Sequence, residues 1–415
     1  MKLMGTSWSY ISEGNAHIVI QLKGTNYILR LIKEGRKPIL PERVQDSLDF
    51  VNLVMVPLLK NFNYGVAEIF NISECNLNQL IKDLHIYRPK ERLEKSIVNH
   101  SAIKTANLSI VSVDCRTNYC VEIKPKEGFI SSGLKMYSKC YYCLKQYYKL
   151  HNSDVKEISA YCPLDLFSGD KIRMRKCLLN MIKTPQNNFK FFMNGKLYDY
   201  NKLCGTNMQL GDCPLLHSPE LFIDFIIKVL LSGTSVNKNV LKEIERKSPE
   251  LTKDTTMKLC NECSSLKPNN LLYNLLKLQQ LSEISTLKDL EIPKKDYDYV
   301  HQILKQLKTR SLDLNVKEDR DTFFSTAGGL NLALIAAVAK DCSIMISFTT
   351  DYVENIPYID IEYLSNEKSR LYYKVALTDL EPKPITTLLK RKQTEKQLIN
   401  IYEKHIQLSI SKEYI

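Results

Sequence analysis

The sequence predicts a mixed α/β protein of the α+β kind, and three observations support this fold class. "NAHIVIQL" and "YILRLIK" alternate apolar and polar residues on either side of a "KGTN" turn, which is typical of a β-hairpin. "YCVEIKPK" is rich in apolar and β-branched residues, as buried strands are. "IRMRKCLLNMIKTP" repeats its apolar residues at helical spacing and should stop at Pro185.

The remaining elements are predicted in chain order from the same patterns. A helix should cover "RVQDSLDFVNLVMVPLL" and end at Pro57, and "LSIVSVD" should form a buried strand. Residues 134–150 should form one helix with a single stripe of lysines: Lys135, Lys139, Lys145 and Lys149. A solvated helix face and an anion site both explain this stripe. Later helical patterns are "ELFIDFIIKVLL", "NNLLYNLLKLQQL" and "LLKRKQTEKQLINIYEKH".

The composition is that of a globular protein with a basic excess. Its 415 residues are enough for one large domain or two lobes, and its net charge is +12. This excess favours a nucleic acid, an acidic membrane or a phosphorylated small molecule, although a solvated basic surface would also explain it. The N-terminus lacks the apolar core of a secretory signal, and "LNLALIAAVA" is far shorter than a membrane span of ~20 residues. We therefore expect a soluble protein of the cytosol or nucleus, without a membrane partner.

Twelve cysteines are scattered along the chain, which fits reduced thiols better than a disulfide framework. Two pairs have CxxC spacing, Cys140/Cys143 and Cys260/Cys263. More than one hundred residues separate these pairs, whereas the two halves of a zinc ribbon lie about 15–20 residues apart. We expect Cys140 and Cys143 to be buried on one helix turn, and a structural zinc at Cys260 and Cys263 stays open.

Two aspartates stand at the ends of predicted buried strands. "GLNLALIAAVAKDCSIMISF" should be a buried helix that runs into a buried strand, with Asp341 at the junction. "YYKVALTDL" should be a strand that ends on Asp379. Carboxylates at such positions supply the base and the magnesium ligand in phosphoryl-transfer enzymes. A helix cap or a solubilising strand end would explain either aspartate alone.

Charged residues also follow two strands at a spacing of two. The first row is Glu122, Lys124 and Lys126 in "EIKPKEGF", and the second is Asp379, Glu381 and Lys383 in "DLEPKP". Alternate residues of an extended segment share a face, and each row begins near the core, where unpaired charges are costly. A ligand with several phosphates and magnesium would satisfy both signs of charge, although self-pairing at a surface would too.

Two turns could contact such a ligand. "SEGNAH" (12–17) contains Gly14 and Ala16, whose small size suits backbone amides near a phosphate, and Arg30 on the next strand could reach the same phosphates. "TPQNNF" offers Asn187 and Asn188 either as turn formers or as uncharged ligand contacts.

In motif order the chain resembles the inositol-pentakisphosphate 2-kinase family. The matching stretches include "SEGNAHIVI", "EIKPKEGF", "PLDLFSG", "TPQNNFKFFMNG" and "AKDCSIMISF", and they extend from residue 8 to about 384. The resemblance implies a two-lobed inositol polyphosphate kinase fold distantly like protein kinases, with ATP in the cleft between lobes. Residues 1–114 would form the N-lobe, and 115–415 the C-lobe with its inositol-phosphate-binding region. The implied reaction is ATP-dependent phosphorylation of the 2-hydroxyl of inositol 1,3,4,5,6-pentakisphosphate to inositol hexakisphosphate (phytate).

The resemblance also implies roles for individual residues. Asp341 would take the hydroxyl proton, Lys124 would bridge the transferring and accepting phosphates, and Asp379 would bind Mg²⁺. Nucleotide contacts would come from Glu13, Gly14, Asn15, Ala16, His17, Arg30, Glu122 and Asp379. Substrate contacts would come from Arg92, Lys124, Lys126, Lys145, Lys149, Asn187, Asn188 and Lys383.

The sequence departs from the family pattern at several positions. Asn15 replaces a usual glycine and His17 a usual asparagine, so the loop should approach phosphate differently. Relatives carry an arginine at the position of Tyr141 and a histidine at that of Lys145, and Arg391 replaces a tyrosine of plant members. Lys145, Lys390 and Lys392 could compensate in charge but would not reproduce arginine's bidentate geometry. The zinc ligands of plant members have no counterpart, so magnesium is the only metal that the resemblance implies.

A second hypothesis is a non-catalytic protein that kept the kinase fold and binds inositol polyphosphates or nucleic acid. The altered loop and the replaced arginine and histidine motivate it. Aromatic platforms at the spacing of RNA-binding modules are absent, so a nucleic-acid partner is not expected. The retained Asp341 and Asp379 favour the enzyme, which we expect to be a monomer.

Overall fold

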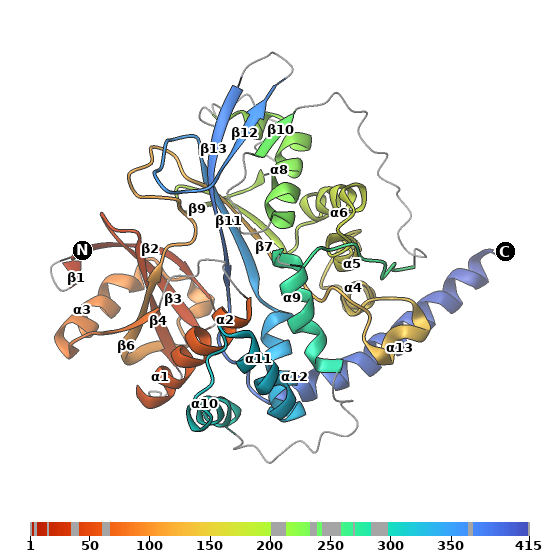
Figure 1. Cartoon of the computed structure of the whole chain (residues 1–415), viewed down its shortest axis with the longest axis horizontal. Coiled ribbons are helices and arrows are strands. Elements are labelled where there is room, and N and C mark those ends of the chain that lie inside the picture. Colours follow the sequence, from red (N-terminus) through yellow and green to blue (C-terminus); the bar gives the residue numbers. More distant parts are fainter. Residues whose placement is uncertain are drawn as a thin grey trace.

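Two β-sheets and a set of helices make up the protein, whose structure is a computed structural model. It describes residues 2–3, 6–14, 16–34, 41–59, 67–200, 213–232, 239–242, 259–268, 270–283, 298–363 and 368–413. The first sheet lies on one side of the molecule, the second runs through its centre, and most helices lie beyond the second sheet (Figure 1). The mixed α/β fold class of the α+β kind is confirmed.

The first sheet comes from the N-terminal quarter of the chain and is antiparallel throughout, in the order β1-β2-β3-β4-β6-β5. Its strands are β1 (Lys2–Leu3), β2 (Thr6–Glu13), β3 (His17–Leu22), β4 (Tyr27–Glu34), β5 (Glu68–Asn71) and β6 (Ser96–Ala106). The predicted hairpin is formed by β3 and β4 and is confirmed. Every second residue of β3 is buried, and helix α3 (Glu74–His85) packs Leu77, Leu80 and Leu84 into the same core.

The second sheet has the order β10-β12-β13-β11-β7-β8-β9. Its strands are β7 (Tyr119–Ile123), β8 (Phe189–Met193), β9 (Lys196–Tyr198), β10 (Asn239–Lys242), β11 (Ser343–Thr349), β12 (Tyr358–Glu362) and β13 (Lys368–Thr378). Neighbours are antiparallel except β10 and β12, which are parallel. All residues of β7 and β11 are buried, because these two central strands are covered on both faces.

Helices and short turns of helix enclose the second sheet and share one large apolar core with it. The α-helices are α4 (Tyr141–His151), α5 (Pro163–Leu166), α6 (Lys171–Lys183), α8 (Pro219–Leu231), α9 (Leu271–Gln280), α10 (Tyr299–Thr309), α11 (Lys317–Thr326), α12 (Gly329–Ala339) and α13 (Thr386–Glu413). Short 3-10 helices are η2 (Lys90–Arg92), η3 (Ser132–Tyr137), η4 (Pro214–His217) and η5 (Leu281–Glu283). The predicted helices that became α6, α8, α9, α12 and α13 are confirmed.

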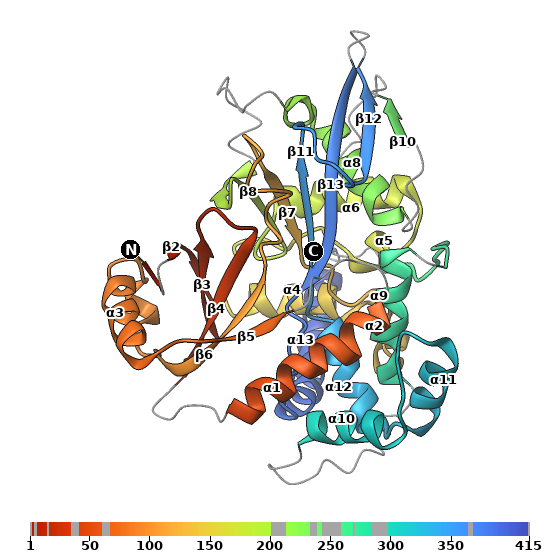
Figure 2. The same cartoon turned by 60° about the vertical axis from the view of Figure 1, so that its left-hand side comes forward.

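The helix that crosses from the first sheet to the helical side does not end at Pro57. It continues from α1 (Pro41–Asp49) through a π-helical segment, η1 (Phe50–Met55), into α2 (Val56–Leu59) (Figure 2). A π-helix shifts the backbone hydrogen bonds by one residue, which makes room for a proline that lacks an N–H. Apolar residues of η1 and α2 pack into the core of the second sheet, not the first.

Two other predicted elements are wrong. The segment "LSIVSVD" (108–114) is not a strand, because the side chain of Asn118 accepts hydrogen bonds from the N–H groups of Val111 and Ser112 in place of a neighbouring strand. Residues 134–150 are not one helix, because Ser138 adopts a left-handed conformation between η3 and α4. Lys145 and Lys149 therefore lie on α4, whereas Lys139 precedes it and is buried.

Among the described helices none is by itself long and apolar enough to cross a membrane. Helices α11 and α12 reach that length and apolarity only as a pair, and they are bent by 118° relative to each other.

Candidate functional site

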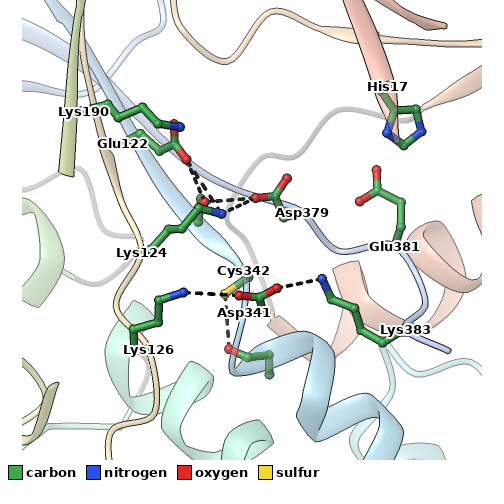
Figure 3. Close-up of polar contacts among 12 residues, drawn as sticks. His17, Glu122, Lys124, Lys126, Lys190, Asp341, Cys342, Asp379, Glu381 and Lys383 are labelled. Atoms are coloured by element: carbon green, nitrogen blue, oxygen red, sulfur yellow. Dashed lines mark hydrogen bonds and ion pairs between the residues drawn. The ribbon is translucent and has the colours of Figure 1, made fainter. Parts of the chain in front are cut away.

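Three segments far apart in sequence leave the second sheet at one edge, and their charged residues meet there (Figure 3). Ile123 at the end of β7 pairs with Ile344 of β11, and Thr378 at the end of β13 pairs with Ser343. Lys124, Asp341 and Asp379 therefore lie just beyond the same row of the sheet. Both predicted rows of charge do face one site.

Asp379 is the centre of a hydrogen-bonded group at this edge. Lys124 Nζ donates to Asp379 Oδ2 at 2.7 Å, and the hydroxyl of Ser343 lies 3.2 Å from the same oxygen and 3.0 Å from Glu122 Oε1. Lys190 Nζ pairs with the other oxygen of Glu122 at 2.8 Å. Burial raises the pKa of Asp379, but Lys124 and Arg30 outweigh it and hold that pKa below its ordinary value. The carboxylate is therefore ionised and is held by an ammonium group and a hydroxyl group.

Asp341 stands at the end of α12, between two lysines. Lys126 Nζ lies 3.3 Å from Asp341 Oδ1, and Lys383 Nζ lies 2.9 Å from Oδ2. Burial raises the pKa of Asp341, and the two lysines more than reverse this, so its pKa lies below the ordinary value. About half of the Asp341 side chain remains exposed (53%), so a substrate can reach it.

The sequence pattern predicted that both rows lie on extended strands, and this prediction is wrong. β7 ends at Ile123 and β13 ends at Thr378. Lys126 and Asp379 then adopt positive φ angles of 59° and 62°, which turn the chain sharply at both places. Lys126 consequently points to Asp341, and Lys124 points to Asp379 (Figure 3).

A cavity of about 950 Å³ opens beside Asp341. Predicted substrate contacts that line it are Lys126, Lys145, Lys149, Asn187, Asn188 and Lys383. Lys149 donates to Gln186 Oε1 at 2.6 Å, and the buried Asn188 donates to the hydroxyl of Tyr142 at 2.7 Å, so both are held in place. Arg92 lies on η2 beside the first sheet and does not line this cavity.

Of the loop that was predicted to contact the nucleotide, only some residues are exposed to a ligand. The side chain of Glu13 is shielded from solvent and paired with Lys33 at 2.6 Å and Arg88 at 2.9 Å, which gives its carboxylate a structural role at the first sheet. The Gly14 N–H donates to the carbonyl of His17 at 2.9 Å and closes a turn that leaves Gly14 and Ala16 exposed. Asn15 lies outside the described residues.

Arg30 on β4 links this loop to the segment after β13. Its guanidinium forms an ion pair with Glu381, and its Nη2 lies 3.4 Å from Nδ1 of His17. Burial, followed by the charge of Arg30, lowers the pKa of His17 to about 4, so the imidazole is neutral at physiological pH. A neutral imidazole can accept a hydrogen bond from the arginine.

Comparisons with known proteins identify the family. The family described as inositol-pentakisphosphate 2-kinase matches residues 10–397, from β2 to α13. The chain is 27% identical to the inositol-pentakisphosphate 2-kinase of Danio rerio over 97% of this chain and 94% of that protein. It is 29% identical to that of Arabidopsis thaliana over 90% of this chain and 79% of that protein. The chain belongs to the inositol-pentakisphosphate 2-kinase family.

An ionic cluster at the cavity wall was not predicted from the sequence. Glu127 is buried and pairs with Lys340 Nζ at 2.7 Å and with Arg391 Nη2 at 2.5 Å. The guanidinium of Arg391 lies 4.0 Å from the ring centre of Tyr141. Glu127 stands directly after the first row, but its partners lie over two hundred residues away in sequence, so no local pattern reveals the cluster.

Four cysteines converge away from the site, which corrects the sequence interpretation of the two CxxC pairs. The sulfur atoms of Cys140, Cys143, Cys162 and Cys260 all lie within 4.8 Å of one another, whereas Cys263 is exposed and outside this group. Cys162 and Cys260 are 3.8 Å apart, the separation expected at about 2.3 Å Zn–S bonds in a tetrahedron. The backbone N–H of Cys140 donates to Cys260 Sγ and that of Cys143 to Cys140 Sγ, each at 3.4 Å. This donor set fits Zn²⁺ and, unlike Cys260 with Cys263, supplies four ligands.

Proposed function

We propose that this chain transfers the γ-phosphate of ATP to the 2-hydroxyl of inositol 1,3,4,5,6-pentakisphosphate, giving inositol hexakisphosphate. Membership of the family supports the reaction. The observation that carries the proposal is the pair Asp341 and Asp379, each held by lysines at one sheet edge beside a large basic cavity. Phosphoryl transfer needs positioning and charge stabilisation more than covalent chemistry, and this site offers both.

Asp341 is proposed to accept the proton of the attacking hydroxyl. Its ionised carboxylate is exposed at the cavity, and Lys126 and Lys383 orient it from both sides. When substrate phosphates enter, these lysines can donate to them and to Asp341 in turn. Lys145, Lys149, Asn187 and Asn188 are proposed to hold further phosphates of the inositol. Arg92, on η2 beside the first sheet, is proposed as an additional substrate contact.

The other half of the site is proposed to hold the nucleotide and Mg²⁺. Asp379 with Glu122 and Ser343 presents the carboxylate and hydroxyl oxygens that Mg²⁺ prefers, so the donor set fits this ion, with Asp379 as the residue that would hold it. Magnesium supplies positive charge that neutralises the nucleotide's phosphates. Lys124, now paired with Asp379, is placed to stabilise charge on the transferred group. Exposed Gly14 and Ala16, together with the partly buried His17 and Arg30, approach from the first sheet.

This arrangement supports a two-lobed kinase architecture with residues 1–114 and 115–415 as lobes and the nucleotide between them. The ion pair of Arg30 with Glu381 spans the boundary. Because η1 and α2 pack in the core of the second sheet, the proposed N-lobe contributes one helix to the other lobe.

A labelled-ATP assay tests the function. Inositol 1,3,4,5,6-pentakisphosphate, Mg²⁺ and the full chain should yield hexakisphosphate, with Asp341→Asn lowering kcat by about 10²–10⁴-fold, as loss of a general base does. Glu354→Gln, on the loop before β12, is the control and should leave kcat unchanged. Tight pentakisphosphate binding without ATP consumption would instead indicate a non-catalytic binder, and full activity of Asp341→Asn would reject its role as base.

A further inference from the structure

The ion pair between Arg30 and Glu381 joins the two sheets beside the proposed nucleotide site. Arg30 comes from β4 of the first sheet, and Glu381 lies two residues after Asp379. Both side chains are mostly shielded from solvent, with exposed fractions of 13% and 24%. Figure 3 shows Glu381 extended between Asp379 and His17, on the side of Asp379 that faces the first sheet.

The Arg30 guanidinium reaches Glu381, which lies only two residues along the chain from Asp379. A polyphosphate held near Asp379 would therefore also come within reach of the Arg30 guanidinium, whose fork matches the oxygens of a phosphate as well as those of a carboxylate. Phosphate and Glu381 would compete for the same donors.

We propose that Glu381 is a positioning residue. In the free protein its carboxylate pairs with the Arg30 guanidinium, and a nucleotide phosphate displaces it when the nucleotide binds. The inference rests on the proposed function, because it assumes that a nucleotide occupies the cleft between the two sheets. His17 supports Arg30 from its other side, 3.4 Å from Nη2, and so keeps the guanidinium at the cleft when Glu381 withdraws. Glu381 itself makes no bond to substrate in this scheme.

The exchange has two consequences of opposite sign. Without nucleotide, the Glu381 carboxylate neutralises a shielded arginine and stabilises the fold. With nucleotide, breaking that ion pair opposes binding. A neutral side chain at residue 381 should therefore destabilise the free protein and tighten nucleotide binding at the same time. A residue with only a structural role would produce the first effect alone, and a direct ligand of the nucleotide or its metal would weaken binding.

The test measures binding of Mg²⁺ with a non-hydrolysable ATP analogue to the full chain by calorimetry, with melting temperatures in parallel. Glu381→Gln, and Glu381→Ser as a second neutral variant, should lower the dissociation constant by about three- to tenfold, the range expected for a partly shielded ion pair. They should also lower the melting temperature of the free protein. Glu381→Asp, which keeps the charge, should bind within about twofold of wild type.

Two controls separate this inference from its alternatives. Glu68→Gln removes a more exposed ion pair of the first sheet, with Lys104 at 2.7 Å, and should leave nucleotide affinity unchanged. In an Arg30→Gln background, Glu381→Gln should no longer tighten binding. Unchanged or weaker binding by Glu381→Gln, while wild type binds normally, would overturn the inference and leave the proposed function standing. Absence of nucleotide binding by wild type would overturn both.

Discussion

Two residues of the site hold backbone conformations that favour glycine. Asp379 and Lys126 have φ angles near 60°, a conformation that costs a residue with a side chain on the order of 1 kcal/mol or more. Glycine would adopt it freely. Charged side chains occupy both positions although the backbone conformation is unfavourable for them. Asp379 is paired with Lys124, and Lys126 is paired with Asp341. This strain supports a functional role for both.

His17 should make the stability of the protein depend on pH on the acid side. Its pKa is about 4 in the folded chain and 6.5 for an unperturbed histidine. Below about pH 6.5, His17 is protonated in the unfolded chain but stays neutral in the folded protein. The free energy of unfolding therefore decreases as the pH is lowered, until His17 is protonated in both states near pH 4. The loss should reach at most about 3 kcal/mol.

Urea unfolding of wild type and His17→Asn at pH 7.0, 5.5 and 4.5 measures this contribution. The variant should lose less stability than wild type over that interval. Identical pH profiles for the two proteins would show that His17 is not the group responsible.

At the scale of elements, the long C-terminal helix α13 is anchored by a buried ionic cluster. Glu127, just after β7, binds Lys340 at the end of α12 and Arg391 on α13. Burial raises the pKa of Glu127, but the two cations outweigh it and hold its pKa below the ordinary value, so the carboxylate is charged. The cluster thereby sets α13 against the wall of the cavity and places Lys390 and Lys392 at its edge.

Glu127→Gln should destabilise the protein by about 3 kcal/mol or more, because it leaves two shielded cations without a counter-charge. Chemical unfolding measures the change. Glu403→Gln is a matched control on α13, since Glu403 is exposed and accepts one hydrogen bond from Tyr137, and it should cost less than about 1 kcal/mol. Equal effects of the two substitutions would contradict the anchoring role.

At the scale of the whole molecule, contacts between distant segments hold the helical side together. The four-cysteine cluster joins the start of α4, the residue before α5 and the segment 259–268. Arg173 on α6 adds hydrogen bonds to the carbonyls of Asn261 and Cys263, each at 2.7 Å. Because α4 carries Lys145 and Lys149, the cluster positions one wall of the cavity from behind.

The purified chain should contain about one zinc ion, and a strong chelator should lower its melting temperature by about 5 °C or more. Cys162→Ser and Cys260→Ser should lose the metal, because each removes one of four ligands. Cys263→Ser should retain it, since this exposed thiol lies outside the cluster. Elemental analysis of each protein supplies the readout, and wild type purified without metal would refute the site.

Much of the fold was predictable because its elements show periodic patterns or continuous apolar runs. Strand β3 of the β3–β4 hairpin alternates buried and partly exposed residues, whereas α12 and β11 are continuous apolar runs of the length expected for a buried helix and a buried strand. The strand prediction for residues 108–114 was wrong because the Asn118 side chain, and not a neighbouring strand, accepts the hydrogen bonds of residues 111 and 112. The predicted helix end at Pro57 was wrong because a π-helical segment accommodates the proline.

The sequence by itself determined the fold class, most elements and the charged rows that mark the site, because periodicity and charge spacing are local properties. Only the tertiary structure decided which charges pair. It buried Glu13 in the first sheet, joined Arg30 to Glu381, and brought Cys260 to Cys140 and Cys143 across more than one hundred residues. Such contacts depend on chain segments that meet only after folding, and no spacing within one segment encodes them.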